Sequence, residues 1–144
     1  MNTKIKILFL ALLAFIACSK KDDVSPKDSF INSLTASTWV TESVYNETDG
    51  DLTSQYTAFS IVFRKNSSGD YNGDYYVANG SHAFSTSFGK WKISDDLKTM
   101  TFDNGKQITV DMTSGRLKLD FVVSASGGRT NGLKGHFTFV LKTS

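Results

Sequence analysis

Cysteine is nearly absent from this sequence, and so are the motifs that usually carry enzyme chemistry. Cys18 is the only cysteine among 144 residues, which excludes an internal disulfide and leaves no thiol nucleophile downstream of it. His82 and His136 are the only histidines, and we expect both at turns or solvent-facing positions rather than as general bases. The sequence contains no nucleophile elbow, P-loop, dinucleotide-binding fingerprint or His-Glu-x-x-His motif. We therefore expect no enzyme activity, no metal and no cofactor.

A surplus of either charge is also lacking. The chain has 16 Lys and Arg against 14 Asp and Glu, and two of the basic residues, Lys4 and Lys6, lie in an N-terminal leader. Without these two, 14 basic residues balance 14 acidic ones, and they are scattered along the chain. A neutral domain without a basic stripe has no electrostatic footprint for nucleic acid. We therefore expect no nucleic-acid partner.

The N-terminus does contain an uninterrupted apolar run, from Ile7 to Ala17, directly behind Lys4 and Lys6. The run lacks the polar face of an amphipathic core helix, and it is well short of the ~20 residues that a membrane-spanning helix needs. A short positive stretch followed by an apolar run of this length is typical of a secretory signal peptide. We therefore predict that residues 1–17 are a cleaved signal peptide.

The end of this run, Phe15-Ile16-Ala17-Cys18, resembles the bacterial lipobox. The resemblance implies that Cys18 is acylated and anchors the protein to the outer membrane, where several acyl chains together hold it permanently. Residues 18–26 are polar and have no hydrophobic periodicity, which predicts a flexible tether. Within it, Lys21-Asp22-Asp23 resembles the surface-export signal of Bacteroidetes lipoproteins, and an ordinary charged linker explains the same residues equally well. The anchored domain is therefore expected to face either the periplasm or the cell surface.

Beyond the tether, alternation of apolar and polar residues predicts antiparallel strands. The pattern is clearest in the second half, where Ile108, Val110 and Met112 share one face of a segment whose other face is polar. Turns such as Asp103-Asn104-Gly105 and Ser114-Gly115 separate these segments. Eight strands are predicted, at residues 38–46, 56–64, 73–78, 82–93, 98–103, 106–112, 115–123 and 134–142.

The predicted strand 82–93 is long and changes phase. Phe84 and Phe88 share one parity, Trp91 has the other, and Gly89 lies at the change. A β-bulge at Gly89 would re-aim the strand in this way. This interpretation places both Phe88 and Trp91 on the inner face of the sheet.

A short helix is predicted before the first strand. Ser25 can cap it, Pro26 suits its first position, and Asp28 favours the positive end of its dipole. Its apolar face would consist of Phe30, Ile31 and Leu34.

One short helix followed by eight consecutive antiparallel strands is the plan of the lipocalins. Residues 34–39, Leu-Thr-Ala-Ser-Thr-Trp, resemble the opening of the lipocalin-like domains of Bacteroidetes lipoproteins, and residues 89–96, continuing to Asp120, resemble the same domains. The likeness covers about residues 34–142. It implies that residues 27–144 form an all-β domain, an eight-stranded antiparallel up-and-down barrel.

A barrel of this size can hold one small ligand. The resemblance implies that Trp39 closes the barrel floor, with Lys142 as the candidate to stack on its ring, and a plain core position explains Trp39 equally well. With Trp39, inward parity gives these candidate ligand-lining residues: Phe63, Phe88, Trp91, Phe102, Leu119, Phe121, Phe137 and Phe139. A fully packed core without a cavity would use the same residues.

Two functions follow from these patterns. The first is a cell-envelope lipoprotein whose barrel binds a small apolar ligand. The alternative is an envelope interaction or adhesion protein with a packed, ligand-free core. Such a protein would bind its partner through its loops, of which residues 124–133 are the longest glycine-rich example.

Overall fold

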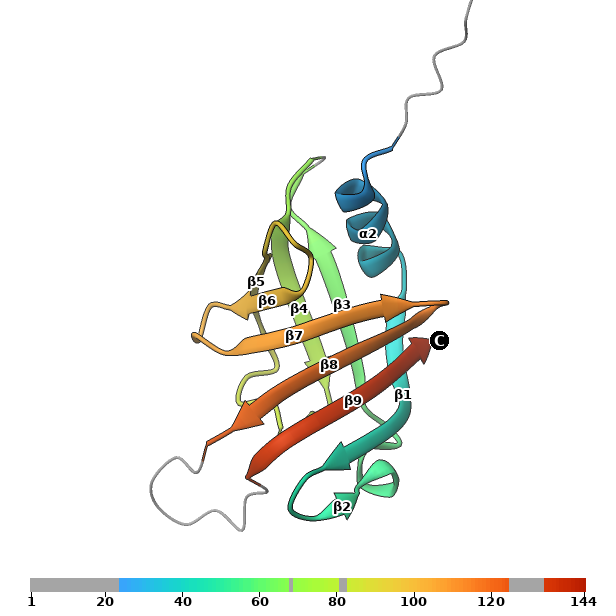
Figure 1. Ribbon diagram of the computed structural model, residues 1–144, viewed down its shortest axis with the longest axis vertical. Coiled ribbons are helices and arrows are strands. Elements are labelled where there is room, and N and C mark those ends of the chain that lie inside the picture. Colours follow the sequence, from blue (N-terminus) through green and yellow to red (C-terminus); the bar gives the residue numbers. More distant parts are fainter. Residues whose placement is uncertain (1–23, 68, 81–82, 125–133) are drawn as a thin grey trace, which may run out of the picture.

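The computed structural model describes residues 24–67, 69–80, 83–124 and 134–144, which form a closed antiparallel barrel with one α-helix (Figure 1). The strands of the barrel are β1 (Thr38–Asn46), β3 (Ser60–Lys65), β4 (Asn72–Ala78), β5 (Phe88–Ile93), β6 (Thr99–Phe102), β7 (Gln107–Thr113), β8 (Arg116–Val123) and β9 (Gly135–Thr143). Each strand pairs with the next along the chain, and β9 pairs with β1 to close the sheet. The prediction of an eight-stranded up-and-down barrel is confirmed.

The predicted N-terminal helix is also confirmed. Helix α2 (Pro26–Thr35) begins with Pro26, and the Ser25 hydroxyl caps it by accepting a hydrogen bond of 3.0 Å from the Asp28 amide. Ile31 and Leu34 are buried against the barrel. The short helix is therefore fixed by a polar cap at its start and by apolar contacts along one side.

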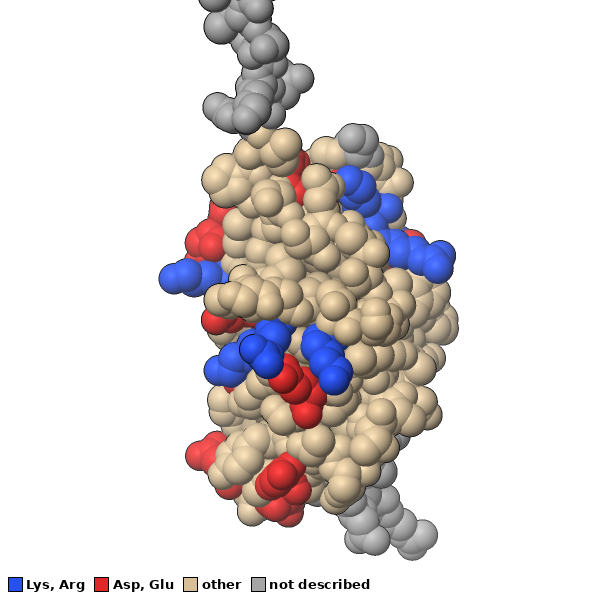
Figure 2. Space-filling model, turned by 90° about the vertical axis from the view of Figure 1, so that its right-hand side faces the viewer, with Lys and Arg blue, Asp and Glu red and all other residues tan. Residues whose placement is uncertain are grey.

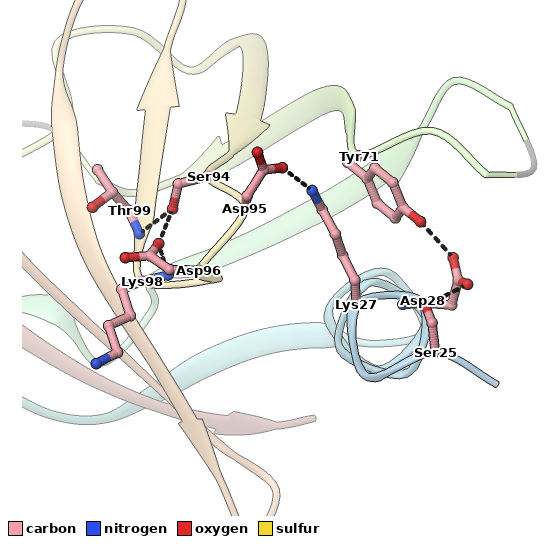
Figure 3. A network of polar contacts seen from close by, with 9 residues as sticks. All are labelled: Ser25, Lys27, Asp28, Tyr71, Ser94, Asp95, Asp96, Lys98 and Thr99. Carbon is pink, nitrogen blue, oxygen red and sulfur yellow. Dashed lines mark hydrogen bonds and ion pairs between the residues drawn. The ribbon is translucent and has the colours of Figure 1, made fainter. Parts of the chain in front are cut away.

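Polar contacts dock the first turn of α2 onto two turns of the barrel (Figure 3). Lys27 Nζ lies 2.6 Å from a carboxylate oxygen of Asp95, in the β5–β6 turn, and 4.1 Å from the centre of the Tyr71 ring, before β4. The Tyr71 hydroxyl donates to the Asp28 carboxylate at 3.3 Å. These contacts fix where the helix sits, although the full exposure of Asp95 limits what its ion pair contributes to stability.

The first connection of the barrel differs from the predicted strand 56–64. Residues Thr53–Tyr56 form a 3₁₀ helix, η1, which follows the two-residue strand β2 (Gly50–Asp51), and β3 begins only at Ser60. The Asp51 side chain accepts a hydrogen bond from the Thr53 amide at the start of η1. Tyr56 then turns inward and packs edge-on against Phe139, with ring centres 5.0 Å apart. Tyr56 is therefore buried from η1 and not from a strand, and β3 is shorter at its start than the predicted strand 56–64.

The predicted strand 82–93 is wrong in its first half, and the inward placement of Phe88 is wrong with it. β5 begins at Phe88, no bulge interrupts its pairing with β4, and Phe88 is 70% exposed on the outer face. Phe84 enters the core from a connection, not from a strand, so its parity says nothing about Phe88. A Cβ on Gly89 would lie 2.8 Å from the Tyr75 hydroxyl. Gly89 therefore makes room for the Tyr75 side chain and does not mark a change of phase.

The centre of the barrel is filled by its own side chains. The other candidate lining residues are all buried, at 3% exposure or less: Trp39, Phe63, Trp91, Phe102, Leu119, Phe121, Phe137 and Phe139. Their rings touch: Phe121 stacks on Phe139 at 5.7 Å between centres, and Tyr75 stacks on Phe102 at 3.9 Å. Phe84 packs against the same cluster, with its ring centre 5.1 Å from that of Phe121. Contacts at these distances leave no space for a ligand between the rings.

The two ends of the barrel are built differently. At one end, which we call the α2 end, the connections are short and span residues 66–71, 94–98 and 114–115. At the other, which we call the cleft end, they span residues 47–59, 79–87, 103–106 and 124–134. In Figure 1, α2 lies at the upper right and β8 ends at the lower left. The three longest connections, 47–59, 79–87 and 124–134, therefore lie at the end that α2 does not cover.

Candidate ligand-binding cleft

Strands β7 and β8 diverge at the cleft end. Their pairing runs from Thr113–Arg116 to Thr109–Asp120 and then stops. Beyond this point the start of β7 pairs only with β6, and the end of β8, from Phe121 onward, pairs only with β9. The separation opens a cleft of about 860 Å³.

The walls of the cleft combine polar and apolar groups. One wall is Asn104–Gln107 with Thr109, and the opposite wall is Asp120–Ser124; Ala83, Ser85, Thr99 and His136 complete the lining. Val122 is 63% exposed, so part of the apolar wall faces solvent directly. A concave site with an apolar wall and a few convergent polar groups is the usual form of a small-molecule site.

The connection between β4 and β5 closes the barrel interior from the cleft. The amides of Ala83 and Phe84 both donate to the carbonyl of Gly80, which forms a tight turn. The turn directs Phe84 into the core, where its side chain is 5% exposed and its ring centre lies 5.3 Å from that of Phe59. Asn104 donates to the Ser85 hydroxyl at 3.1 Å and ties this connection to the β6–β7 turn. The cleft is therefore bounded here by Ala83 and Ser85, while Phe84 between them points into the core.

Lys106 places a cation at the base of the cleft. Its Nζ donates to the carbonyl of Ala83 at 2.5 Å and lies 4.4 Å from the ring centre of Phe121 and 5.2 Å from that of Phe84. Burial lowers the pKa of Lys106 from 10.5 to about 8, because removing water disfavours the charged form. Across the part of the chain that the structure describes, Lys106 forms no ion pair with Asp or Glu.

The acidic residue of the cleft is already neutralised. The Asp120 carboxylate accepts a hydrogen bond of 2.5 Å from Thr138 and lies 2.9 Å from Lys118 Nζ and 3.9 Å from His136 Nε2. His136 faces outward with its side chain 46% exposed, as its parity predicts. Asp120 therefore has its own partners and leaves Lys106 without an acidic one.

Among the described residues, four other basic side chains form ion pairs with Asp or Glu: Lys27, Lys90, Arg116 and Lys118. On the face in Figure 2, Lys and Arg side chains lie in small groups in the upper and middle parts, beside some Asp and Glu, and the lower part carries only Asp and Glu. Arg116, for example, binds Glu42 through two hydrogen bonds of 2.5 and 2.7 Å. This pair lowers the pKa of the Glu42 carboxyl and raises that of the Arg116 guanidinium. Lys106 differs from these four residues in being half-buried and, among the described residues, without a carboxylate partner.

The structure does not bring the candidate lining residues together in one cavity. Phe121 lines the cleft, Trp91 and Phe102 line a shallower pocket of about 460 Å³ beside β4 to β6, and Trp39 lines a groove of about 500 Å³ beside α2. The rest of the buried candidates, Phe63, Leu119, Phe137 and Phe139, line none of these three. The predicted residues mark the core of the barrel, and only Phe121 belongs to the cleft.

Trp39 is held by the helix and not by a stacked cation. Its indole N–H donates to the carbonyl of Leu34 at 2.9 Å, and its ring is 1% exposed. Lys142 follows the inward-facing Leu141 and therefore points outward. In the described ranges no basic side chain lies over the Trp39 ring, so the expected stacking of Lys142 is wrong.

Lys106 is the residue of the cleft that sequence reasoning missed. It follows the turn Asp103-Asn104-Gly105 and is the first residue of the predicted strand 106–112, to which we assigned no functional role. It shares its parity with Ile108 and Val110, which are inward-facing and at most 3% exposed. This inward position of a lysine is the signal that could have identified it.

Several predicted features lie outside the described residues: Cys18, the leader 1–17, residues 18–23 of the tether, His82 and residues 125–133 of the glycine-rich loop. Among the residues that are described, no helix is long and apolar enough to cross a membrane. No three His, Cys, Asp or Glu of these residues lie close enough together to hold a metal ion.

The fold and the cleft together define a closed eight-stranded barrel with a packed centre and one open, partly apolar cleft at an end. In comparisons with known proteins, the chain matches no family model and no curated protein sequence.

Proposed function

We propose that this protein is an envelope lipoprotein whose barrel binds a small, largely apolar ligand in the cleft between β7 and β8. The observation that carries the proposal is the cleft itself. Its volume of about 860 Å³ lies within the range of small-molecule sites, roughly 300 to 1,000 Å³. The exposed Val122 and the buried face of Phe121 supply an apolar wall.

The position of the cleft supports binding beside the barrel interior and not within it. Phe84 lies between the cleft and the central cluster of rings. Its own ring packs against four rings of that cluster, those of Phe59, Phe102, Phe121 and Phe139. A ligand in the centre would have to displace several buried rings, and each displaced ring would lose the free energy of its burial. A ligand in the cleft displaces only water.

Backbone chemical shifts test this function better than tryptophan fluorescence, because neither Trp39 nor Trp91 lines the cleft. We expect a small apolar binder, found by screening single-chain and aromatic compounds, to shift the amides of residues 104–109 and 120–124. Thr109→Trp should block binding by filling the cleft. Thr101→Trp is the matched control, since Thr101 is also an exposed threonine of the sheet but does not line the cleft. Shifts confined to other regions, or no response to any compound, would refute the proposal.

The anchor is the second part of the proposed function, and its support is the sequence around Cys18. In cells that express the full chain, labelled palmitate should be incorporated into the protein and lost in Cys18→Ser. The variant should also leave the membrane fraction. Equal labelling of both proteins would remove the lipoprotein proposal and leave the ligand-binding proposal unaffected.

The alternative function, an interaction protein, has one observation in its favour. Tyr76 and Phe88 are cross-strand neighbours on the outer face of β4 and β5, and they are 46% and 70% exposed. Arg64 lies 5.2 Å from the Tyr76 ring centre, and Tyr and Arg are common at the energetic centres of interfaces. Phe88→Ser should then abolish binding of a defined envelope partner while Thr101→Ser leaves it intact. Equal binding by both variants would exclude this face.

A further inference from the structure

We propose that the ligand of the cleft is a single-chain organic acid whose anionic group binds the ammonium of Lys106. The inference rests on the proposed function and adds the chemical class of the ligand. It starts from a half-buried cation that has no acidic partner among the described residues.

The surroundings of Lys106 compensate its charge only in part. One carbonyl, that of Ala83, and two ring faces, those of Phe84 and Phe121, replace the water that burial removes. An ammonium has three N–H donors, so two remain after the bond to Ala83. The undescribed segments nearest in sequence, 81–82 and 125–133, contain no Asp or Glu. The missing counter-charge must therefore come from outside these segments, and a ligand in the cleft can supply it.

The charges of the cleft favour an anion over a neutral or cationic ligand. Its titratable side chains are Lys106, Asp120 from β8 and His136 from β9. Asp120 is bound by Thr138 and Lys118, so it does not attract a further cation strongly. A neutral ligand would remove water from Lys106 without pairing it, which costs free energy. An acid both pairs the ammonium and fills the cleft.

The apolar wall determines the chemical character of the ligand beyond its acid group. From Lys106 at the base, Phe121, Val122 and Val123 line one side of the cleft along β8. The wall is partly exposed, since Val122 is 63% exposed. A single flexible chain fits such a wall, and its acid group would point to the base of the cleft.

Decanoate and decanol test the charge directly, because they differ only in the head group. At neutral pH and below micelle-forming concentrations, decanoate should bind the full mature protein about tenfold more tightly than decanol, the gain of one charge-assisted hydrogen bond in a partly exposed site. Lys106→Met should remove this difference by weakening decanoate alone. Lys142→Met is the matched control, since Lys142 is an exposed lysine that does not line the cleft, and it should change neither affinity.

A pH series on the unmodified protein gives a second measurement that needs no variant. Because the pKa of Lys106 lies at about 8, the affinity for decanoate should fall as the pH rises above that value, while the affinity for decanol stays constant. The other titratable side chains of the cleft are Asp120 and His136, and Asp120 is already bound by Thr138 and Lys118. This series keeps the proposal testable if Lys106→Met does not fold.

The outcomes separate the inference from the function on which it rests. Equal affinity for decanol and decanoate, unchanged in Lys106→Met, would overturn the inference and leave the proposed function standing. Binding of neither compound, while other apolar compounds shift the cleft amides, would also overturn the inference alone. Binding to vesicles that contain phosphatidylglycerol, without binding of free decanoate, would overturn the free acid as the ligand in favour of a lipid headgroup. No binding of any compound would overturn both.

Discussion

Two lysines, Lys27 at the α2 end of the barrel and Lys106 at the cleft end, are treated in opposite ways. Lys27 is paired with the Asp95 carboxylate and lies against the Tyr71 ring, so its charge helps to attach the helix. Lys106 also lies against aromatic rings, but its partner is a carbonyl and not a carboxylate. The difference shows that one end has its polar groups satisfied within the chain, while the other has a charge that is available to a ligand.

The pairing of β7 with β8 also differs between the two ends of the barrel. At the α2 end the pairing of β7 with β8 continues to Thr113–Arg116, next to the turn, and Trp39 and Leu34 close the interior. At the cleft end the same two strands separate after Thr109–Asp120. Hydrogen bonding thus rigidifies one end and leaves a concave surface at the other. The following predictions test this contrast, beginning with the largest expected effect.

Trp39→Ala should cause the largest loss, because it removes a fully buried ring and its hydrogen bond to Leu34. We expect the free energy of unfolding to fall by about 3–5 kcal/mol, the usual cost of truncating a buried aromatic residue. Urea denaturation followed by far-UV circular dichroism measures it. A loss below about 1 kcal/mol would mean that the α2 end does not hold the barrel together as described.

Phe84→Ala is the matched truncation at the cleft end. Phe84 is also buried, but it lies on a connection that can relax toward the space it leaves. We expect a loss of about 2–3 kcal/mol, below that of Trp39→Ala, and an enlarged cleft that binds bulkier apolar compounds. Denaturation and ligand titration measure the two effects. A larger loss than that of Trp39→Ala would reverse the proposed order of the two ends.

Lys106→Met should change how stability depends on pH. The pKa of Lys106 is lowered to about 8 in the folded protein, so between about pH 8 and 10.5 the unfolded chain binds more protons than the folded one. The stability of the wild type should therefore rise with pH across this window, relative to Lys106→Met. Because part of the side chain reaches solvent, we expect a relative gain on the order of 1 kcal/mol.

Denaturation of both proteins at several pH values measures this gain. Burial raises the pKa of Tyr56 and Tyr75, which therefore titrate later and affect both proteins alike. A constant difference between the two proteins from pH 7 to about pH 10 would show that Lys106 is solvated and not buried.

Asp95→Asn should have the smallest effect, because Asp95 is fully exposed even though it pairs with Lys27. Hydrogen bonding to Lys27 lowers the pKa of the Asp95 carboxyl, so any contribution to stability is present at neutral pH and is lost as the pH falls through this lowered pKa. We expect a slightly lower melting temperature, with the difference from wild type disappearing at high salt. A large, salt-independent fall would show that the pair is essential for docking α2.

The sequence predicted those parts of the fold in which each segment obeys one simple rule. Ile108 and Val110 alternate with polar residues and lie on the inner face of β7, and Ser25 caps α2 as its position before Pro26 indicates. The rule failed at Phe84 and Phe88, because alternation has meaning only inside a strand, and Phe84 lies outside one. Local patterns cannot show where a strand begins when a connection also carries apolar residues.

The candidate site was harder to predict than the fold. Inward parity identified buried residues such as Phe137 and Phe139, but parity does not distinguish a residue that lines a cavity from one that fills the core. The cleft depends on where β7 and β8 stop pairing and on contacts such as that of Lys106 with the Phe84 ring, which join two separate connections. Such long-range contacts leave no periodic signal in the chain.

The pairing of β1 with β9 has a consequence for how this protein is made. Trp39 lies opposite Thr143, so the first strand of the barrel is completed by its last strand. A ribosome that still holds the last strand also holds the barrel open, with two unpaired strand edges, those of β1 and β8. Closure is thus a late, long-range event of the kind that slows folding. Until then, the nascent protein depends on its surroundings to prevent aggregation.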